Sequence, residues 1–134
     1  MKYLVDSDVV ADWLQGKSKA VTLLTSLNFD ELAISLITYG EIYEGVLYAR
    51  DMEHAEQVFR RFCRNITILP VNQIIMRHFG RLRGQLRIAG NVIPDFDLLI
   101  AATAIHYDLA LVTRNTRHFD RVTGLSLYIP SPSE

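Results

Sequence analysis

The stretch Tyr3-Leu4-Val5-Asp6-Ser7-Asp8 decides how this chain folds. Its three apolar residues have the length and character of a short buried β-strand. Carboxylates follow at the end of this strand, where a helical pattern begins that Ser7 or Asp8 can cap. A strand that leads directly into a helix places the Asp6 carboxylate at the rim of a sheet, where ligands bind in open α/β sheets. We therefore expect an acidic site at the carboxyl edge of a sheet.

The rest of the chain alternates short apolar runs with longer helical patterns, which predicts a mostly parallel sheet covered by helices on both faces. The predicted fold class is α/β, in three layers (α/β/α), with four to five short strands in the central sheet. Strands are expected at 3–5, 32–34, 67–69, 109–112 and 125–128, and helices at 8–14, 18–27, 36–49, 51–64, 72–89 and from 94 onward.

The bulk properties favour one domain. The chain has 134 residues, 49% of them hydrophobic, which is enough for one core and too little for two. We expect a single domain over residues 1–130 and a frayed tail over 131–134. The formal net charge is −1, so any contact with nucleic acid must be local.

The chain has the features of a cytoplasmic protein. Its first residues lack the pattern of a signal peptide, and its apolar runs are shorter than the roughly 18 to 20 residues that cross a bilayer. We therefore predict no membrane association. The single cysteine, Cys63, excludes an internal disulfide and suits a reducing compartment.

Three carboxylates, Asp6, Glu41 and Asp97, are expected beside the carboxyl rim of the sheet. Oxygen ligands of this kind suit hard cations such as Mg²⁺ and Mn²⁺, and a bound cation relieves the repulsion among them. Simpler roles also exist for acidic residues in this chain. Asp8 and Asp95 fit helix N-caps, Asp97 fits a first helical turn, and Glu41 fits a solvated helix face.

Four segments carry a family resemblance, in order and over nearly the whole chain. They are Tyr3-Leu4-Val5-Asp6-Ser7-Asp8, Ser35-Leu36-Ile37-Thr38-Tyr39-Gly40-Glu41, Asp97-Leu98-Leu99-Ile100-Ala101-Ala102-Thr103-Ala104 and Leu111-Val112-Thr113-Arg114-Asn115-Thr116-Arg117-His118-Phe119. Together they resemble the PIN-domain ribonucleases, and more narrowly the VapC-type toxins of type II toxin–antitoxin systems. The resemblance implies a PIN-like fold and a Mg²⁺- or Mn²⁺-dependent endoribonuclease that hydrolyses RNA phosphodiester bonds.

The resemblance also implies site residues. Asp6, Glu41 and Asp97 match three acidic positions of the family and would be catalytic residues and metal ligands, with Glu41 a ligand or a base that positions water. Relatives often have Asp at the position of Asn115 or an acid at that of His118.

The fourth site residue is therefore open among Asn115, His118 and Asp120. Asn115 can act through its amide oxygen, and Thr113 can orient the site through its hydroxyl group. Asp8, where relatives commonly have Asn, can supply the missing charge.

The expected partners are RNA, a second copy of the chain and a cognate antitoxin. An acidic pocket repels phosphate unless cations surround it, and Arg114 and Arg117 are the nearest candidates for RNA binding. Arg81, Arg83 and Arg87 form a second group, which also fits a solvated helix face. The homodimer and the antitoxin follow from the family resemblance alone. The resemblance also implies that an arginine of the antitoxin would neutralise the carboxylates.

Two other functions are compatible with the sequence. The Asp6-Ser7-Asp8 motif after a strand also resembles the opening motif of haloacid-dehalogenase-like phosphatases, although the late segment has Arg114 and no lysine. A PIN-like binding module that lost catalysis through Asn115 is the second alternative. Metal-dependent RNA cleavage separates the nuclease from both.

Overall fold

Five parallel strands form one sheet at the centre of the molecule, in the order β3-β2-β1-β4-β5. The computed structural model describes residues 1–130, so the frayed tail predicted for 131–134 lies outside the described residues. The strands are β1 (Tyr3–Val5), β2 (Leu32–Ser35), β3 (Thr67–Leu69), β4 (Ala110–Val112) and β5 (Ser126–Leu127). All five predicted strands are present, and the predicted parallel α/β fold is confirmed.

Helices connect the strands, as the sequence predicts. They are α1 (Ser7–Leu14), α2 (Ser18–Ser26), α3 (Leu36–Leu47), α4 (Met52–Arg64), α5 (Gln73–Ile88), α6 (Asp95–Tyr107) and α7 (Thr116–Phe119), with the 3₁₀ turn η1 at Phe29–Glu31. Neither η1 nor α7 was predicted from the sequence, because one turn is too short to show helical periodicity. Within residues 1–130, no helix combines the length and apolar character required to cross a bilayer.

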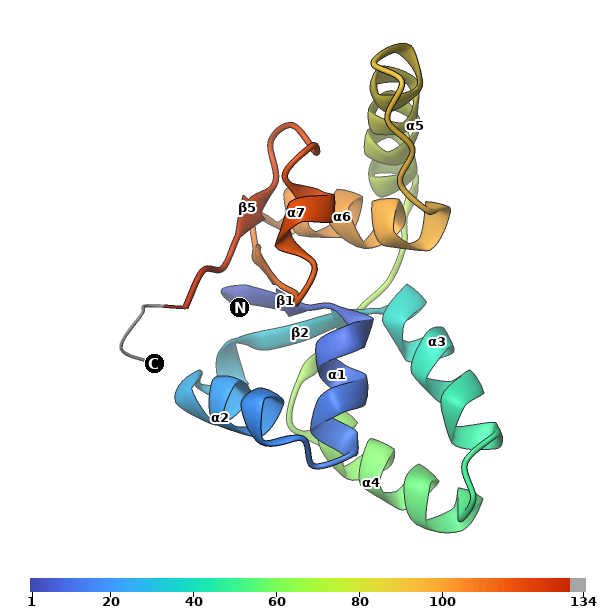
Figure 1. Ribbon diagram of the computed structural model, residues 1–134, viewed down its shortest axis with the longest axis vertical. Helices are drawn as coiled ribbons and strands as arrows, with labels where there is room; N and C mark the ends of the chain where they lie inside the picture. The colour runs from blue at the N-terminus through green and yellow to red at the C-terminus, as the bar shows by residue number, and fades with distance from the viewer. Residues whose placement is uncertain (131–134) are drawn as a thin grey trace.

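Side chains that alternate along the strands build two cores, one on each face of the sheet. Leu4 and Leu111 pack with residues of α5 and α6, whereas Val5 and Val112 pack with residues of α1, α2, α3 and α4. In Figure 1, α5, α6 and α7 lie on one side of β1 and β2, and α1, α2 and α4 lie on the other. The three predicted layers are confirmed.

The most apolar helix, α6, is buried through its middle. All five residues from Ile100 to Ala104 are buried, which agrees with apolar residues on every side of this helix. The helix ends at Asp108, which takes a left-handed backbone conformation with φ of 55°. Because α6 is held firmly at its middle, its exposed first turn has a fixed position above the sheet edge.

The strand order creates a switch point beside β1. The chain builds β2 and β3 on one side of β1 and then returns to build β4 and β5 on the other. At such a point the connections after neighbouring strands diverge, and a crevice opens at their carboxyl ends. Asp6 follows β1 and Thr113 follows β4, so both residues lie at this crevice.

Candidate active site

Asp6 is the central carboxylate of the candidate site. Only 5% of the residue is exposed, and its backbone N–H donates to the carbonyl oxygen of Val112 on β4. Its Oδ1 accepts a 2.8 Å hydrogen bond from the backbone N–H of Ser7, which makes Asp6 the N-cap of α1. The expectation that Ser7 or Asp8 caps this helix is therefore wrong.

Thr113 links Asp6 to the loop after β4. Its hydroxyl group donates to Oδ2 of Asp6 at 2.7 Å and accepts from the backbone N–H of Asn115 at 3.1 Å. The bond to Asp6 is buried and joins residues 107 positions apart in sequence. Thr113 thus orients the Asp6 carboxylate, as the sequence analysis expected of its hydroxyl group.

Asp8 is a second carboxylate beside Asp6, in the first turn of α1. Its Oδ2 accepts from the backbone N–H of Arg114 at 3.1 Å. Its Oδ1 is buried and has no hydrogen-bond donor. An unpaired buried carboxylate oxygen is costly, and it is an acceptor that a cation would satisfy.

These acidic groups disturb one another. The pKa of Asp6 is raised to about 7, mainly by burial and then by the charges of Asp8 and Asp97, while the hydrogen bonds from Thr113 and Ser7 oppose the rise. Burial also raises the pKa of Asp97, His118 lowers it, and the charge of Asp8 raises it. Asp6, Asp8 and Asp97 therefore share one electrostatic environment.

Asp97 lies in the first turn of α6 and faces α7. Its Oδ2 is 3.3 Å from Nε2 of His118, a nitrogen that is buried and makes no well-aligned hydrogen bond. Because α7 was not predicted, the sequence had no signal for this contact. Of the three candidates for the fourth site residue, His118 is the one in contact with a predicted acidic residue.

Glu41 approaches the site through Ser7. The Ser7 hydroxyl group lies 2.6 Å from Oε1 of Glu41 and 3.0 Å from the Thr38 hydroxyl group, and both partners belong to α3. The backbone N–H of the same serine binds Asp6. Ser7 therefore connects the carboxylates of Asp6 and Glu41, a role that was not predicted from the sequence.

A second ionic cluster adjoins Asp8. Asp12, which is buried, pairs with Arg114 at 3.1 Å and with Lys17 at 3.3 Å, and Nε of Arg114 is also 3.6 Å from Asp8. Arg114, predicted to bind RNA, thus already neutralises two carboxylates. Their spacing at positions 8 and 12, one helical turn apart, was the available signal.

The other predicted site residues are exposed. The side chain of Asn115 makes no cap bond to α7, although Asn115 occupies the N-cap position of this helix. Asp120 follows α7 on the surface, and Arg117 is also exposed. Asp95 is the first residue of α6 and pairs with Arg83 at 3.0 Å, so its expected role as an N-cap is wrong.

The residues present fit a hard cation in their chemistry. Within residues 1–130, no group of three or more His, Cys, Asp or Glu side chains is gathered closely enough to hold a metal. The free Oδ1 of Asp8, however, lies in the same electrostatic environment as Asp6 and Asp97. Carboxylate oxygens that lack donors and repel one another are the ligands that Mg²⁺ and Mn²⁺ prefer.

Known proteins resemble this chain over nearly its full length. The model of the PIN domain family matches residues 3–125. The tRNA(fMet)-specific endonuclease VapC of Shigella flexneri is 30% identical, with 93% of this chain and 95% of that protein covered. Ribonuclease VapC19 of Mycobacterium tuberculosis is 37% identical, with 87% and 90% covered. A crystal structure of VapBC2 from Rickettsia felis, bound to a DNA fragment from its promoter, contains a chain with a TM-score of 0.87 and 27% identity, covering 96% of this chain and 98% of that one.

Proposed function

The chain belongs to the PIN domain family, and on this premise we propose that it is the endoribonuclease toxin of a toxin–antitoxin pair. It hydrolyses RNA phosphodiester bonds and is inhibited by a cognate antitoxin. The observation that carries this proposal is the buried Asp6 carboxylate at the switch point of the sheet, close enough to Asp8 and Asp97 for their charges to raise its pKa. The family match also excludes the haloacid-dehalogenase-like phosphatase.

The proposed cofactor is Mg²⁺ or Mn²⁺, held by Asp6 and Asp97 with Asp8 or Glu41. A bound divalent cation would lower the pKa of a coordinated water and offset charge on the phosphate. The support in this chain is chemical: oxygen donors, a buried Asp8 oxygen without a partner, and acidic pKa values raised by burial and mutual repulsion.

The protein's own contribution is to hold these oxygens in place. Ser7 and Thr113 donate to the two oxygens of Asp6, so this carboxylate cannot rotate freely. The Ser7 hydroxyl group holds Glu41, which we propose as a ligand or as the base that receives a proton from the attacking water. The hydrophobic core under β1 and β4 keeps the strand ends, and thus these side chains, fixed.

We propose His118 as the fourth site residue, in preference to Asn115 and Asp120. His118 is half-buried and contacts Asp97, whereas the other two residues are exposed. Asn115 instead supports the site through its backbone, which donates to Thr113. Arg117, which has no ion pair within the described chain, remains our candidate for binding RNA phosphate beside the site.

The proposed partners are RNA, an antitoxin and a second copy of the chain. The VapBC complex of Rickettsia felis provides the precedent for the antitoxin, and the homodimer rests on family likeness. We infer that an arginine from the antitoxin would pair with Asp8 or Asp97, since its positive charge would relieve the repulsion among the carboxylates of the site. We propose a cytoplasmic location, which suits an RNA substrate.

RNA cleavage by the purified chain tests this function. We expect cleavage with Mg²⁺ or Mn²⁺, none in EDTA, and none with Asp6→Asn. Asp30→Asn, which changes an exposed aspartate of η1, is the matched control and should cleave like the wild type. If the wild type does not cleave, or if Asp6→Asn cleaves undiminished, the nuclease assignment fails. A folded but inactive wild type would favour the binding module.

A further inference from the structure

The basic residues of this chain are concentrated in one segment. Residues 57–94 contain seven of the fourteen Lys and Arg residues and no Asp or Glu. Four of these arginines lie on α5, at positions 77, 81, 83 and 87, and all four are exposed. The remainder of the chain is therefore strongly acidic, and α5 creates a local positive potential that the net charge of −1 conceals.

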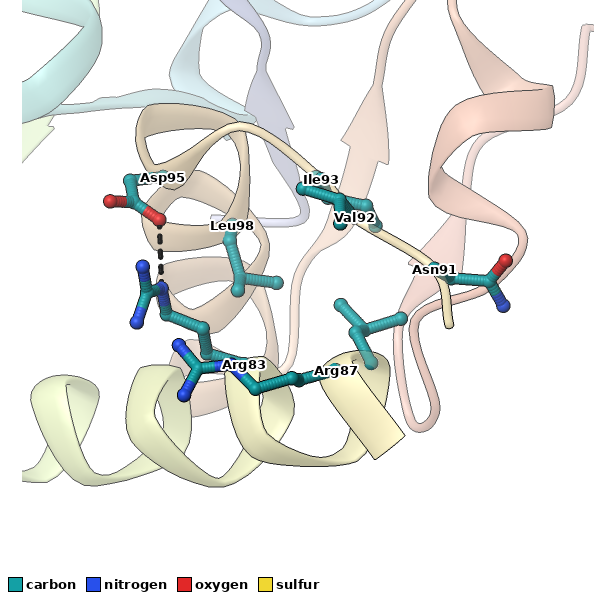
Figure 2. Close-up of a pocket in the computed structure, with 8 residues that line it drawn as sticks. Arg83, Arg87, Asn91, Val92, Ile93, Asp95 and Leu98 are labelled. Carbon is teal, nitrogen blue, oxygen red and sulfur yellow. Dashed lines mark hydrogen bonds and ion pairs between the residues drawn. The ribbon is translucent and has the colours of Figure 1, made fainter. Parts of the chain in front are cut away.

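A pocket opens where this basic helix meets the loop that leads into α6 (Figure 2). Arg83 and Arg87, one turn apart on α5, line one side, and Asn91 and Val92 of the loop line another. Leu86, Ile93 and Leu98 are buried and provide an apolar floor. The pocket has a volume of about 210 Å³. This is below the roughly 300 Å³ at which small-molecule sites begin, so the pocket fits part of a larger ligand.

The two pocket arginines differ in their partners. Nε of Arg83 binds Oδ1 of Asp95 at 3.0 Å, and Figure 2 shows this pair at the edge of the pocket. Arg87 has no ion pair or side-chain hydrogen bond within residues 1–130. Since Arg83 neutralises Asp95, the single acidic residue of the pocket, Arg87 leaves the pocket with a net positive charge. An anion is therefore the complementary ligand.

The pocket lies close to the candidate active site. Asp95 lines the pocket, and Asp97, two residues later in the first turn of α6, faces His118. Residues two positions apart project to nearly opposite sides of a helix, and a helix with its side chains is about 10 to 12 Å across, so the two positions are expected about one helix width apart. A single nucleic-acid strand that crosses the first turn of α6 would reach both within a few nucleotides.

We propose that this pocket is a subsite for the single-stranded RNA substrate, beside the bond that is cleaved. Arg87 binds a backbone phosphate, and one base or ribose lies on the apolar floor. The pairing of a cation with an apolar surface suits RNA, because each nucleotide presents both a phosphate and a flat base that stacks on Arg or apolar side chains. This inference rests on the proposed ribonuclease function.

RNA affinity in EDTA tests the subsite without requiring cleavage. The probe is a short fluorescein-labelled single-stranded RNA, with anisotropy measured from about 50 to 200 mM salt. Arg87→Ala should weaken binding about tenfold and reduce the slope of log K against log salt by about 0.7, the value for one lost phosphate contact on a single strand. Val92→Glu, an exposed change that adds an acid at the rim, should weaken binding similarly.

Arg81→Ala is the matched control, because it removes the same charge from the same helix outside the pocket. This substitution should weaken RNA binding less than threefold, because a charge outside the pocket acts on the RNA only at long range, where salt screens it. Equal losses for Arg87→Ala and Arg81→Ala would overturn the subsite in favour of a diffuse basic surface. Unchanged RNA affinity with weakened antitoxin binding or dimerisation would show that a protein occupies the pocket. Absence of cleavage by the wild type, in contrast, would overturn the proposed function and leave the binding result standing.

Discussion

Nε2 of His118 lies 3.3 Å from Oδ2 of Asp97, so the short helix α7 contributes directly to the acidic site. The contact offsets part of the rise in the pKa of Asp97 that burial causes. Nitrogen and oxygen donors together suit Mn²⁺ and later transition metals better than Mg²⁺, which prefers oxygen alone.

His118→Ala should weaken Mn²⁺ binding about 10- to 100-fold, the loss typical when a residue that ligates or orients a metal ligand is removed. Calorimetric titration of the folded protein measures this directly. His54→Ala, which changes an exposed histidine of α4, should leave Mn²⁺ affinity unchanged. Tighter Mn²⁺ binding by His118→Ala would mean that the imidazolium competes with the metal and would contradict our assignment.

Asp6→Asn should stabilise the metal-free protein above pH 7. The folded protein holds a proton on Asp6 up to a pH of about 7, whereas the unfolded chain releases it near its ordinary pKa of about 3.9. Between these pH values the folded state binds more protons, so the contribution of Asp6 to stability falls as pH rises from about 4 to about 7. Because the pKa of Asp6 is raised to about 7, Asp6→Asn should increase the free energy of unfolding at pH 8 by at most about 4 kcal/mol. The increase should become progressively smaller toward pH 4.

Urea unfolding in EDTA at pH 8 and at pH 5 measures this effect of Asp6→Asn. The gain in the free energy of unfolding should be larger at pH 8. Asp30→Asn controls for the loss of one negative charge and should show little difference between the two pH values. If Asp6→Asn is no more stable than the wild type at pH 8, the charged Asp6 carboxylate does not destabilise the folded protein, and the raised pKa of Asp6 is contradicted.

Ser7→Ala should slow RNA cleavage about tenfold, mainly through kcat. The variant loses the 2.6 Å hydrogen bond that holds Glu41, but it keeps the backbone N–H that binds Asp6. Loss of one positioning contact in a catalytic site commonly costs such a factor. Ser7→Thr retains the hydroxyl group and should restore most of the rate.

Ser26→Ala serves as the control for Ser7→Ala, because the Ser26 hydroxyl group binds only the carbonyl oxygen of Leu23 on the surface of α2. Thermal unfolding should show that both alanine variants remain folded. An unchanged kcat for Ser7→Ala would remove the Ser7–Glu41 contact from the proposed chemistry.

Arg114→Ala should tighten Mn²⁺ binding several-fold. The arginine side chain neutralises Asp8 and Asp12, so it competes with a metal for the negative charge of Asp8. Because this side chain is 63% exposed, its ion pairs should contribute only about 0 to 1 kcal/mol to stability. Arg117→Ala, which removes an unpaired charge from α7, should leave Mn²⁺ affinity unchanged. Weaker Mn²⁺ binding by Arg114→Ala would show that the arginine instead holds Asp8 in its binding position.

The elements of this fold are largely readable from the sequence. The apolar run Tyr3 to Val5 and the apolar helix that starts beside Asp97 lie where the sequence places them, because strand and helix periodicity are local properties. The helix caps were harder to predict. Asp6, Ser7 and Asp8 are all good N-cap residues, and only the backbone conformation selects Asp6.

Local pattern also indicates the residues that we propose to carry the chemistry, because Asp6, Glu41 and Asp97 are carboxylates expected beside the carboxyl rim of the sheet. Which atoms meet was decided by the tertiary structure alone. The order β3-β2-β1-β4-β5 brings Thr113 onto Asp6 across 107 positions, places Ser7 between Asp6 and Glu41, and sets α7 against α6 so that His118 contacts Asp97. The physical reason is that hydrogen bonds and ion pairs act over about 3 to 4 Å, and only the packing of the two cores onto one sheet sets distances between segments so far apart in the chain.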